Sequence, residues 1–298
     1  MIESRRERVI GGIVINATYI LFCAACLLPF LLVVAISVSS EADITHDGYR
    51  LIPAALDLTA YRYVFENPGQ IIQSYKVSLF VSLFGTAVSV FIMLLAAYPL
   101  SRTRFRSRGI VMFYIFFTML FSGGLVPSYI LITRYLRLGD TIWVLIVPGL
   151  VNAWTIIIMR SFCRKIPESI FESAKMDGAN EFQIFLRLVI PLSKPLIATM
   201  ALLGVLTRWN DWFTALLYIR DESLFPLQYL LQRIMRELQF LMDITQRQMT
   251  INLADVVRIP GETMRMAMAV VAAGPMLVVF PFFQRYFVKG MTVGSIKG

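Results

Sequence analysis

The residues of this chain best suited to chemistry form a short polar string inside an apolar stretch: Arg208, Trp209, Asn210, Asp211 and Trp212. Polar groups in such a stretch normally face a cavity or a partner. Trp rings pack against the C–H faces of sugar rings, while amide and carboxylate groups hydrogen-bond hydroxyl groups. We therefore interpret the string as a candidate substrate pathway, in which Arg208 and Asp211 could pair as helix neighbours three residues apart. The alternative is a polar clamp between helices that never contacts a substrate.

The sequence offers no catalytic centre. Its only histidine, His46, lies outside the apolar stretches, so it cannot complete a metal site or activate a nucleophile within them. Cys23 and Cys26 lie in an apolar run without histidine or acidic partners, which is typical of small core residues. No G-x-x-x-x-G-K-[ST] phosphate-binding loop occurs. We therefore predict that the chain is not an enzyme, does not hydrolyse ATP and binds no cofactor or metal of its own.

The composition is that of a membrane protein. Of the 298 residues, 57% are hydrophobic and 16% charged, and the mean hydropathy is +0.69, whereas soluble domains carry about 25% charged residues. A helix needs about 20 mainly apolar residues to span a bilayer. We predict an all-α polytopic membrane protein, with a single domain over residues 1–298. Its six transmembrane helices fall approximately at residues 12–38, 71–100, 110–133, 142–159, 198–219 and 266–286.

Lysines and arginines set the predicted orientation. The loop between the second and third stretches carries Arg102, Arg104, Arg106 and Arg108, and the segment between the fourth and fifth stretches is also basic. The loops on the opposite side contain far fewer Lys and Arg residues. Because basic loops stay in the cytoplasm, both termini are predicted to be cytoplasmic. This orientation accounts for the net charge of +9 without nucleic acid as a partner.

The last predicted external segment, residues 220–265, is more than a simple loop. Apolar residues recur at helical spacing from Leu227 to Met242, with polar residues between them, which predicts a strongly amphipathic helix. This helix could lie on the outer membrane surface, pack on a neighbouring protein or pack within the chain's own outer rim. The sequence leaves these alternatives open.

The cytoplasmic segment of residues 160–195 is predicted to contain two short helices joined by a sharp elbow. Pro167 suits the first turn of a helix over residues 168–176, because its missing amide would be unpaired there. Asp177 and Gly178 should end that helix, since glycine readily adopts the left-handed conformation that closes helices.

A second short helix should follow the elbow. Asn180 is a good N-cap, and Gln183 three residues later completes a capping-box pattern. Pro191 and Pro195 should then stop this helix. Two such helices would form a rigid knob that could transmit motion from a partner better than a flexible loop.

The string ESAKMDGANEFQIFLRLVIPLSKP in this segment resembles the EAA loop of type I binding-protein-dependent ABC importers. Ser173 stands where that family usually has Ala. The likeness extends from residue 124 to residue 298, through TRWNDWFTALLYI and the tail KGMTVGSIKG, to carbohydrate permeases of the maltose-permease kind. Such a long ordered match is far more specific than a short motif. The matched motif positions are Glu172, Ala174, Asp177, Gly178, Ala179 and Pro191.

The resemblance implies a type I ABC importer permease fold in a bacterial inner membrane, with residues Glu172 to Ala179 coupling the chain to an ATPase. It also implies a second permease subunit in a heterodimer, two cytoplasmic ATPase subunits that bind ATP and Mg, and an extracytoplasmic solute-binding protein. The implied substrate is a saccharide, more specifically an oligosaccharide, with acidic sugars such as alginate among the candidates. The alternative function is a secondary carrier or channel acting alone, followed by a structural membrane scaffold.

Overall fold

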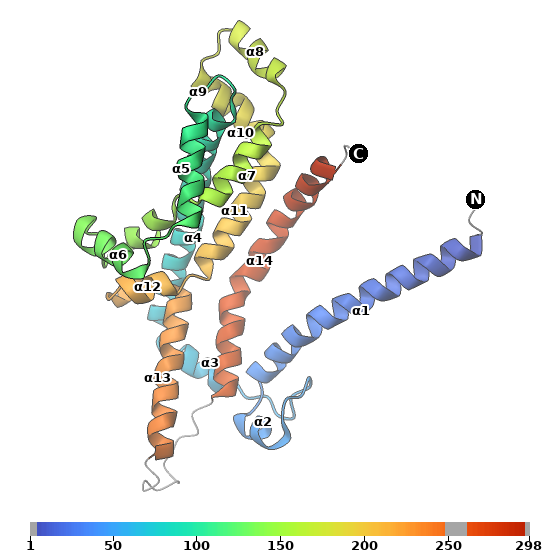
Figure 1. Cartoon of the computed structure of the whole chain (residues 1–298). Coiled ribbons are helices and arrows are strands. Elements are labelled where there is room, and N and C mark those ends of the chain that lie inside the picture. Colours follow the sequence, from blue (N-terminus) through green and yellow to red (C-terminus); the bar gives the residue numbers. More distant parts are fainter. Residues whose placement is uncertain (1–4, 248–260, 296–298) are drawn as a thin grey trace. The chain divides into compact units, whose positions relative to one another are not determined.

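The computed structural model describes residues 5–247 and 261–295, which form helices joined by short loops (Figure 1). The prediction of an all-α chain is thereby confirmed. The chain divides into two compact units, residues 1–68 with 233–274 and residues 69–232 with 275–298. The prediction of one membrane domain stays a prediction.

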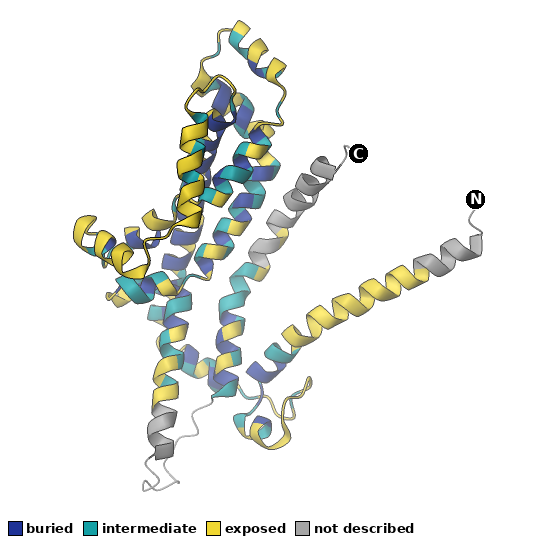
Figure 2. Ribbon diagram, in the orientation of Figure 1, coloured by how far each residue is buried: buried dark blue, intermediate teal, exposed yellow. Residues whose placement is uncertain are grey.

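The first unit combines the N-terminal helices with a segment from the C-terminal third of the chain. They are α1 (Arg5–Ser37), α2 (Glu41–Asp47), α3 (Thr59–Val64), the later part of α13 (Leu227–Arg247) and the start of α14 (Glu262–Ser295). Apolar side chains of α1 from Ile13 to Leu31 are exposed, whereas its end at Ala35, Ile36 and Ser37 is buried (Figure 2). A long apolar surface of this kind is suited to lipid or to another chain.

Glu41 links α2 to the start of α14. Its carboxylate accepts hydrogen bonds of 3.0 Å from the backbone N–H groups of Glu262 and Thr263, and one of 2.7 Å from the Thr263 hydroxyl. A carboxylate at this position satisfies amides that have no partner inside the helix and favourably opposes the helix dipole. Burial raises the pKa of Glu41, but these hydrogen bonds outweigh burial and hold the pKa below its usual value.

The second unit is a bundle around α4. Its helices are α4 (Pro68–Ser101), α5 (Arg108–Leu120), α6 (Leu125–Ile130), η1 (Leu131–Tyr135), η2 (Ile142–Leu145), η3 (Val147–Gly149), α7 (Ala153–Cys163), α8 (Glu168–Met176), α9 (Glu181–Ile184), η4 (Phe185–Val189), α10 (Ile190–Leu192), α11 (Lys194–Trp209), α12 (Phe213–Tyr218) and η5 (Glu222–Leu224). The start of α13 and the later part of α14 complete the unit.

Several predicted spans are broken. Ile13–Ser37 and Pro68–Ser101 are continuous, while three pairs of helices are bent by 113°, 50° and 78°, so the described residues contain up to five spans if each pair counts as one. The breaks have local causes: Gly124, with a φ of +83°, precedes α6, and the Asn152 side chain caps α7 by accepting a 3.0 Å hydrogen bond from the Thr155 amide. The six predicted stretches fall on these elements and on α14, but hydropathy along the chain does not predict the breaks.

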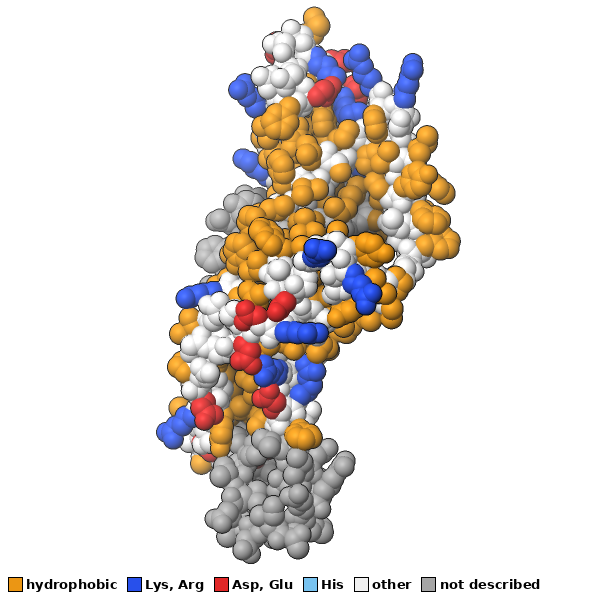
Figure 3. Space-filling model, turned by 90° about the vertical axis from the view of Figure 1, so that its left-hand side faces the viewer, with side chains coloured by type: hydrophobic (Ala, Val, Ile, Leu, Met, Phe, Trp, Pro, Cys, Tyr) orange, Lys and Arg blue, Asp and Glu red, His pale blue; other side chains and the backbone are white. Residues whose placement is uncertain are grey.

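The surface of the second unit agrees with a membrane environment. Apolar residues of α5 such as Ile110 and Phe113 are more than 60% exposed. Figure 3 shows charged side chains gathered at the level of α8, a largely hydrophobic band below them, and a second group of charged side chains below that band. This distribution is expected where lipid, rather than water, contacts the middle of the helices.

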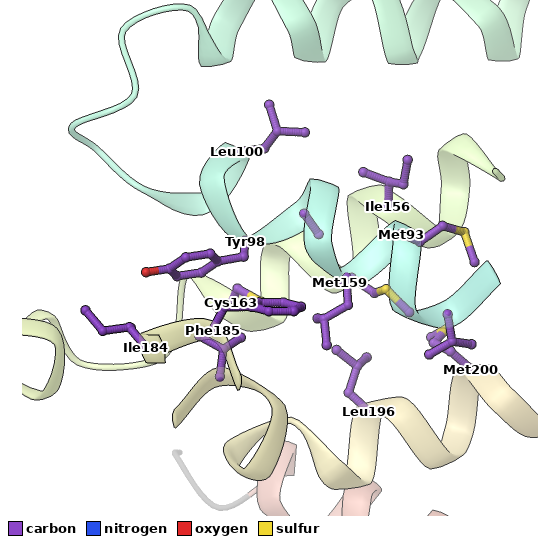
Figure 4. Packing of buried hydrophobic residues seen from close by; sticks show 14 of the residues in the cluster. Met93, Tyr98, Leu100, Ile156, Met159, Cys163, Ile184, Phe185, Leu196 and Met200 are labelled. Atoms are coloured by element: carbon purple, nitrogen blue, oxygen red, sulfur yellow. The ribbon is translucent and has the colours of Figure 1, made fainter. Parts of the chain in front are cut away.

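One hydrophobic cluster holds the end of α4 against its neighbours (Figure 4). Between helices surrounded by lipid, such a cluster is stabilised by close van der Waals packing and not by removal of apolar surface from water. Phe171 and Phe185, from either side of the predicted elbow, are each 1% exposed. The cluster therefore fixes the elbow to the transmembrane helices. Its members include Met93, Tyr98, Met159, Cys163, Phe171, Phe185, Leu196 and Met200.

Candidate functional site

The elbow after α8 is a Schellman motif. The backbone N–H of Ala179 donates to the carbonyl of Ala174, and that of Gly178 to the carbonyl of Lys175, each at 3.0 Å. This pair of bonds requires a left-handed residue after the helix. Gly178 supplies it with a φ of +80°, as predicted. Pro167 differs slightly from the prediction, because it is the extended N-cap residue of α8 and not part of its first turn.

The second helix begins as predicted but ends differently. Asn180 Oδ1 accepts a 2.8 Å hydrogen bond from the Gln183 amide, and Gln183 Oε1 accepts one of 3.0 Å from the Asn180 amide, which completes the capping box. Pro191 and Pro195 were predicted to stop this helix, and the helical segment does end between them. It continues through the π-helical η4 and α10 to Leu192, one residue past Pro191, so Pro191 does not itself end it. The chain turns at Ser193, and Pro195 starts α11.

Phe171 anchors α8 to the end of α4. Its ring stacks on Tyr98 with 6.0 Å between centroids, and the Arg102 guanidinium lies 3.7 Å from the centre of the Phe171 ring. A cation over an aromatic face is stabilising by about 0.5–2 kcal/mol, depending on its desolvation. Arg102 also forms a 2.5 Å ion pair with Glu168 in the first turn of α8.

A second set of contacts closes the elbow. Lys175 Nζ lies 2.6 Å from Glu181 Oε1, which joins α8 to α9 across the turn. The Tyr98 hydroxyl donates to the other carboxylate oxygen of Glu181 at 2.7 Å. Figure 4 shows that this hydroxyl points away from the hydrophobic cluster. The elbow is therefore held to α4 by apolar, ionic and hydrogen-bonding contacts together.

The opposite face of α8 is free to meet a partner. Glu172, Ser173, Asp177 and Gly178 are exposed, and Met176 is 88% exposed. A surface hollow of about 410 Å³ lies beside them, lined by Ala174, Asp177, Gly178, Ala179, Gln183, Ile184, Arg187 and Leu188. The structure thus brings the predicted coupling residues from Glu172 to Ala179 together, while Pro191 lies farther along in α10.

Several residues of this site were missed at the level of sequence. Met176 lies inside the predicted coupling segment but was not named within it, and its exposure adds an apolar contact to that face. Phe171 could have been identified as the buried side of a short amphipathic helix. Tyr98, Arg102 and Glu181 gave no local signal, since their contacts join segments that are far apart in the chain.

The second candidate site lies where α11 ends. Arg208 Nη2 donates to the Gly149 carbonyl at 2.7 Å, and Nη1 lies 3.5 Å from the Thr86 hydroxyl. The guanidinium fits because Gly85 of α4 has no side chain, since a Cβ there would lie 2.9 Å from Arg208 Nε. Gly204 of α11 instead allows the two helices to approach, because a Cβ on it would lie 2.8 Å from Thr86 Cγ2. Arg208 therefore connects α11 to α4 and η3.

The predicted pairing of Arg208 with Asp211 is not what the structure shows. The helix ends at Trp209, so the spacing of three residues no longer places the two side chains on one helix face. Asp211 instead accepts hydrogen bonds from the Thr214 amide at 3.1 Å and the Thr214 hydroxyl at 2.6 Å, and thereby stabilises the start of α12.

The aromatic members of the string have different surroundings. Trp209 is 1% exposed and lies beside Tyr75, with 6.3 Å between ring centroids. Its burial argues against the predicted contact with a substrate and assigns it to helix packing. Trp212 is 36% exposed and Asn210 is exposed. The break between α11 and α12 thus presents the Trp212 indole, which can stack on a sugar ring. The Asn210 amide donates a 2.8 Å hydrogen bond to the Leu206 carbonyl and accepts one of 3.4 Å from Gln228, which leaves one N–H of its side chain for a hydroxyl group.

Comparison with known proteins agrees with this architecture. Polygalacturonan/rhamnogalacturonan transport system permease protein YtcP of Bacillus subtilis is 41% identical over 282 residues, covering 94% of this chain and 95% of the relative. Protein LplC of the same organism is 40% identical over 97% of this chain and 96% of the relative. A solved structure of a bacterial ABC transporter involved in the import of the acidic polysaccharide alginate gives a TM-score of 0.78 at 33% identity, covering 96% of this chain and 99% of that one.

A family model described as binding-protein-dependent transport system inner membrane component matches residues 74–293. The match includes most of α4, the elbow and both candidate sites. Members of this family are membrane transport components and not enzymes, which confirms the prediction on catalysis. The resemblance to type I importer permeases is confirmed as well. The chain therefore belongs to the family of inner-membrane permease components of binding-protein-dependent ABC transport systems.

Proposed function

We propose that this chain is the permease subunit of an ATP-driven importer for an acidic oligosaccharide. The observation that carries the proposal is its similarity, over nearly its whole length, to a permease named for polygalacturonan and to a transporter for alginate. Polygalacturonan is a polymer of a uronic acid, so both names concern chains of sugar carboxylates. The hydrogen bonds of Arg208 described above go to uncharged groups, and Asp211 acts on the guanidinium electrostatically without a hydrogen bond to it. The positive charge of Arg208 is therefore only partly neutralised, which leaves it able to attract an anion.

The partners follow from the transport class. A second permease subunit would complete a heterodimeric pathway, two cytoplasmic ATPase subunits would bind ATP and Mg, and a solute-binding protein would deliver the sugar. The exposed face of α8, from Glu172 to Gly178, would seat in the ATPase, with Met176 as its apolar contact. This assignment requires the basic loops and both termini to be cytoplasmic, as the distribution of Lys and Arg favours.

Within the polar string, the exposed side chains would contact the sugar. Trp212 would stack on a ring and Asn210 would hydrogen-bond a hydroxyl group. Arg208 would contribute its charge and hold α11 to α4, and Asp211 would order the turn between them. Trp209 would support the turn from inside the bundle.

The test is uptake by the complete complex in vesicles, with ATP on the ATPase side. Oligogalacturonate should be taken up, whereas its methyl ester, which has the same rings without charge, should be taken up poorly. Equal uptake of both would refute the acidic preference but leave the importer assignment intact. Uptake by the two permease subunits without ATPase would instead support a carrier acting alone.

A further inference from the structure

A pocket of about 450 Å³ lies where α4 ends and the arginine-rich loop begins. Tyr98, Arg102 and Glu181 of the elbow line one side of it, but neither site above assigns the pocket an occupant. Leu95 and Pro99 of α4 line it together with Phe105 of the loop, and Phe182 and Phe185 line it from the segment after the elbow. Leu95, Phe105 and Phe182 are 40%, 38% and 58% exposed. The pocket is therefore open to its surroundings and mostly apolar, which calls for an apolar occupant.

The charges at the rim of this pocket do not cancel. Arg102 is paired with Glu168, and Glu181 is paired with Lys175, so these two lining residues carry little net charge. Arg104 also lines the pocket, is exposed, and has no ion pair with any residue that the structure describes. One uncompensated guanidinium thus lies beside an apolar hollow.

We propose that this pocket binds an anionic phospholipid, with its phosphate on Arg104 and an acyl chain against α4. Basic pockets at the membrane interface are suited to anionic headgroups, and guanidinium matches the geometry of phosphate. Phe91, one turn before Leu95 on the same helix face, is 42% exposed, so the apolar surface continues from the pocket along the span. Arg104 lies three residues beyond the end of α4 at Ser101, in the basic loop that follows the apolar stretch of this helix.

The proposal has a structural consequence for the elbow. The occupant would touch the end of α4 through Leu95 and the segment after the elbow through Phe182. The bound lipid would thereby limit how far α4 and the segment after the elbow can move apart. The lipid composition of the membrane would then influence the position of the elbow.

The experiment measures lipid retained by the purified complex. The full complex is placed in nanodiscs of phosphatidylcholine and phosphatidylglycerol, transferred to detergent and examined by native mass spectrometry. Arg104→Ala should lower retained phosphatidylglycerol by about fivefold, the factor expected for one surface cation. Arg106→Ala is the matched control, because Arg106 is exposed in the same loop but does not line the pocket. Arg104→Lys should restore most of the retention.

Two further measurements locate the lipid. Leu95→Trp fills the pocket without changing any charge and should also lower retention. Phosphatidylglycerol with a photoreactive acyl chain should label peptides around residues 91–99. Equal losses in Arg104→Ala and Arg106→Ala, equal retention of phosphatidylcholine, or labelling confined to another subunit would each overturn the proposal. None of these readouts requires transport, so they are independent of the proposed substrate.

Discussion

Replacing Gly178 tests the proposed coupling role most directly. Gly178 has a φ of +80° and closes the Schellman motif, and a Cβ there would meet no atom within 4 Å. The cost of a side chain is therefore conformational. A left-handed backbone costs an L-residue about 1–2 kcal/mol, which lowers the population of the closed elbow relative to open forms by about five- to thirtyfold. A β-branched residue such as Val should be at the upper end of this range.

A graded series separates backbone strain from bulk at the proposed ATPase contact. Asn tolerates the left-handed conformation better than Ala, although it is larger. If backbone strain causes the loss of activity, uptake and substrate-stimulated ATP hydrolysis should be reduced least in Gly178→Asn, more in Gly178→Ala and most in Gly178→Val. If side-chain bulk causes the loss, Gly178→Asn should be less active than Gly178→Ala. Both activities should fall together, while binding of sugar to the solute-binding protein stays unchanged.

The assay is sugar uptake and ATP hydrolysis in vesicles, with the amount of bound ATPase subunit as the control for assembly. Full uptake by Gly178→Val in a complex of normal composition would refute the coupling role of this elbow. Loss of bound ATPase with Val, but not with Asn, would show that the closed elbow is needed for docking itself.

The other predictions concern topology, the substrate site and pH. A reporter fused after Arg106 should be cytoplasmic and one near Gly48 external, because the four-arginine loop favours the cytoplasm; an external signal after Arg106 would reverse the orientation. Trp212→Ala should reduce uptake without loss of assembly. Trp209→Ala should instead destabilise the complex by about 3–5 kcal/mol, which thermal unfolding would measure. The reverse pattern would contradict the assignment of Trp212 to the substrate and Trp209 to helix packing. Glu41→Gln should cost about 1 kcal/mol at neutral pH through the weaker cap on α14. The pKa of Glu41 is lowered in the folded chain, so the stabilisation from its carboxylate should be full above the ordinary pKa of Glu and should disappear as pH falls through the folded pKa. Below that pH, Glu41→Gln and wild type should have the same thermal stability. A constant difference at all pH values would contradict this.

Local rules predicted the elbow well because its structure is local. Gly178 and Asn180 determine the helix end and the next helix start through bonds to residues at most five positions away. The same rules overestimated how strongly Pro191 stops a helix, because they did not predict the π-helical segment η4 that precedes it. The amphipathic helix in residues 220–265 was also predicted correctly. Its first apolar residues, Leu227 and Leu230, are buried in the second unit, so the start of this helix packs within the chain. Residues 248–260 of the predicted segment lie outside the described residues.

The substrate string was harder to predict because its geometry depends on other helices. Apolar residues continue past Trp209 at helical spacing, so the pattern does not indicate that α11 ends there. The burial of Trp209 depends on Tyr75, and the position of Arg208 depends on the absence of a side chain at Gly85. Such long-range fits cannot be inferred from spacing within one segment.

Helix α4 connects the two candidate sites in a way that neither site reveals alone. Near its end, Tyr98 holds the elbow through Phe171 and Glu181. Thirteen residues earlier, Gly85 lies against the Arg208 guanidinium, which is a separation of about 20 Å along a helix. The only proline inside α4, Pro99, follows Tyr98, so the intervening helix has no proline kink. In the proposed transport cycle, a displacement of the elbow by the ATPase would therefore act on the break between α11 and α12 through one stiff helix.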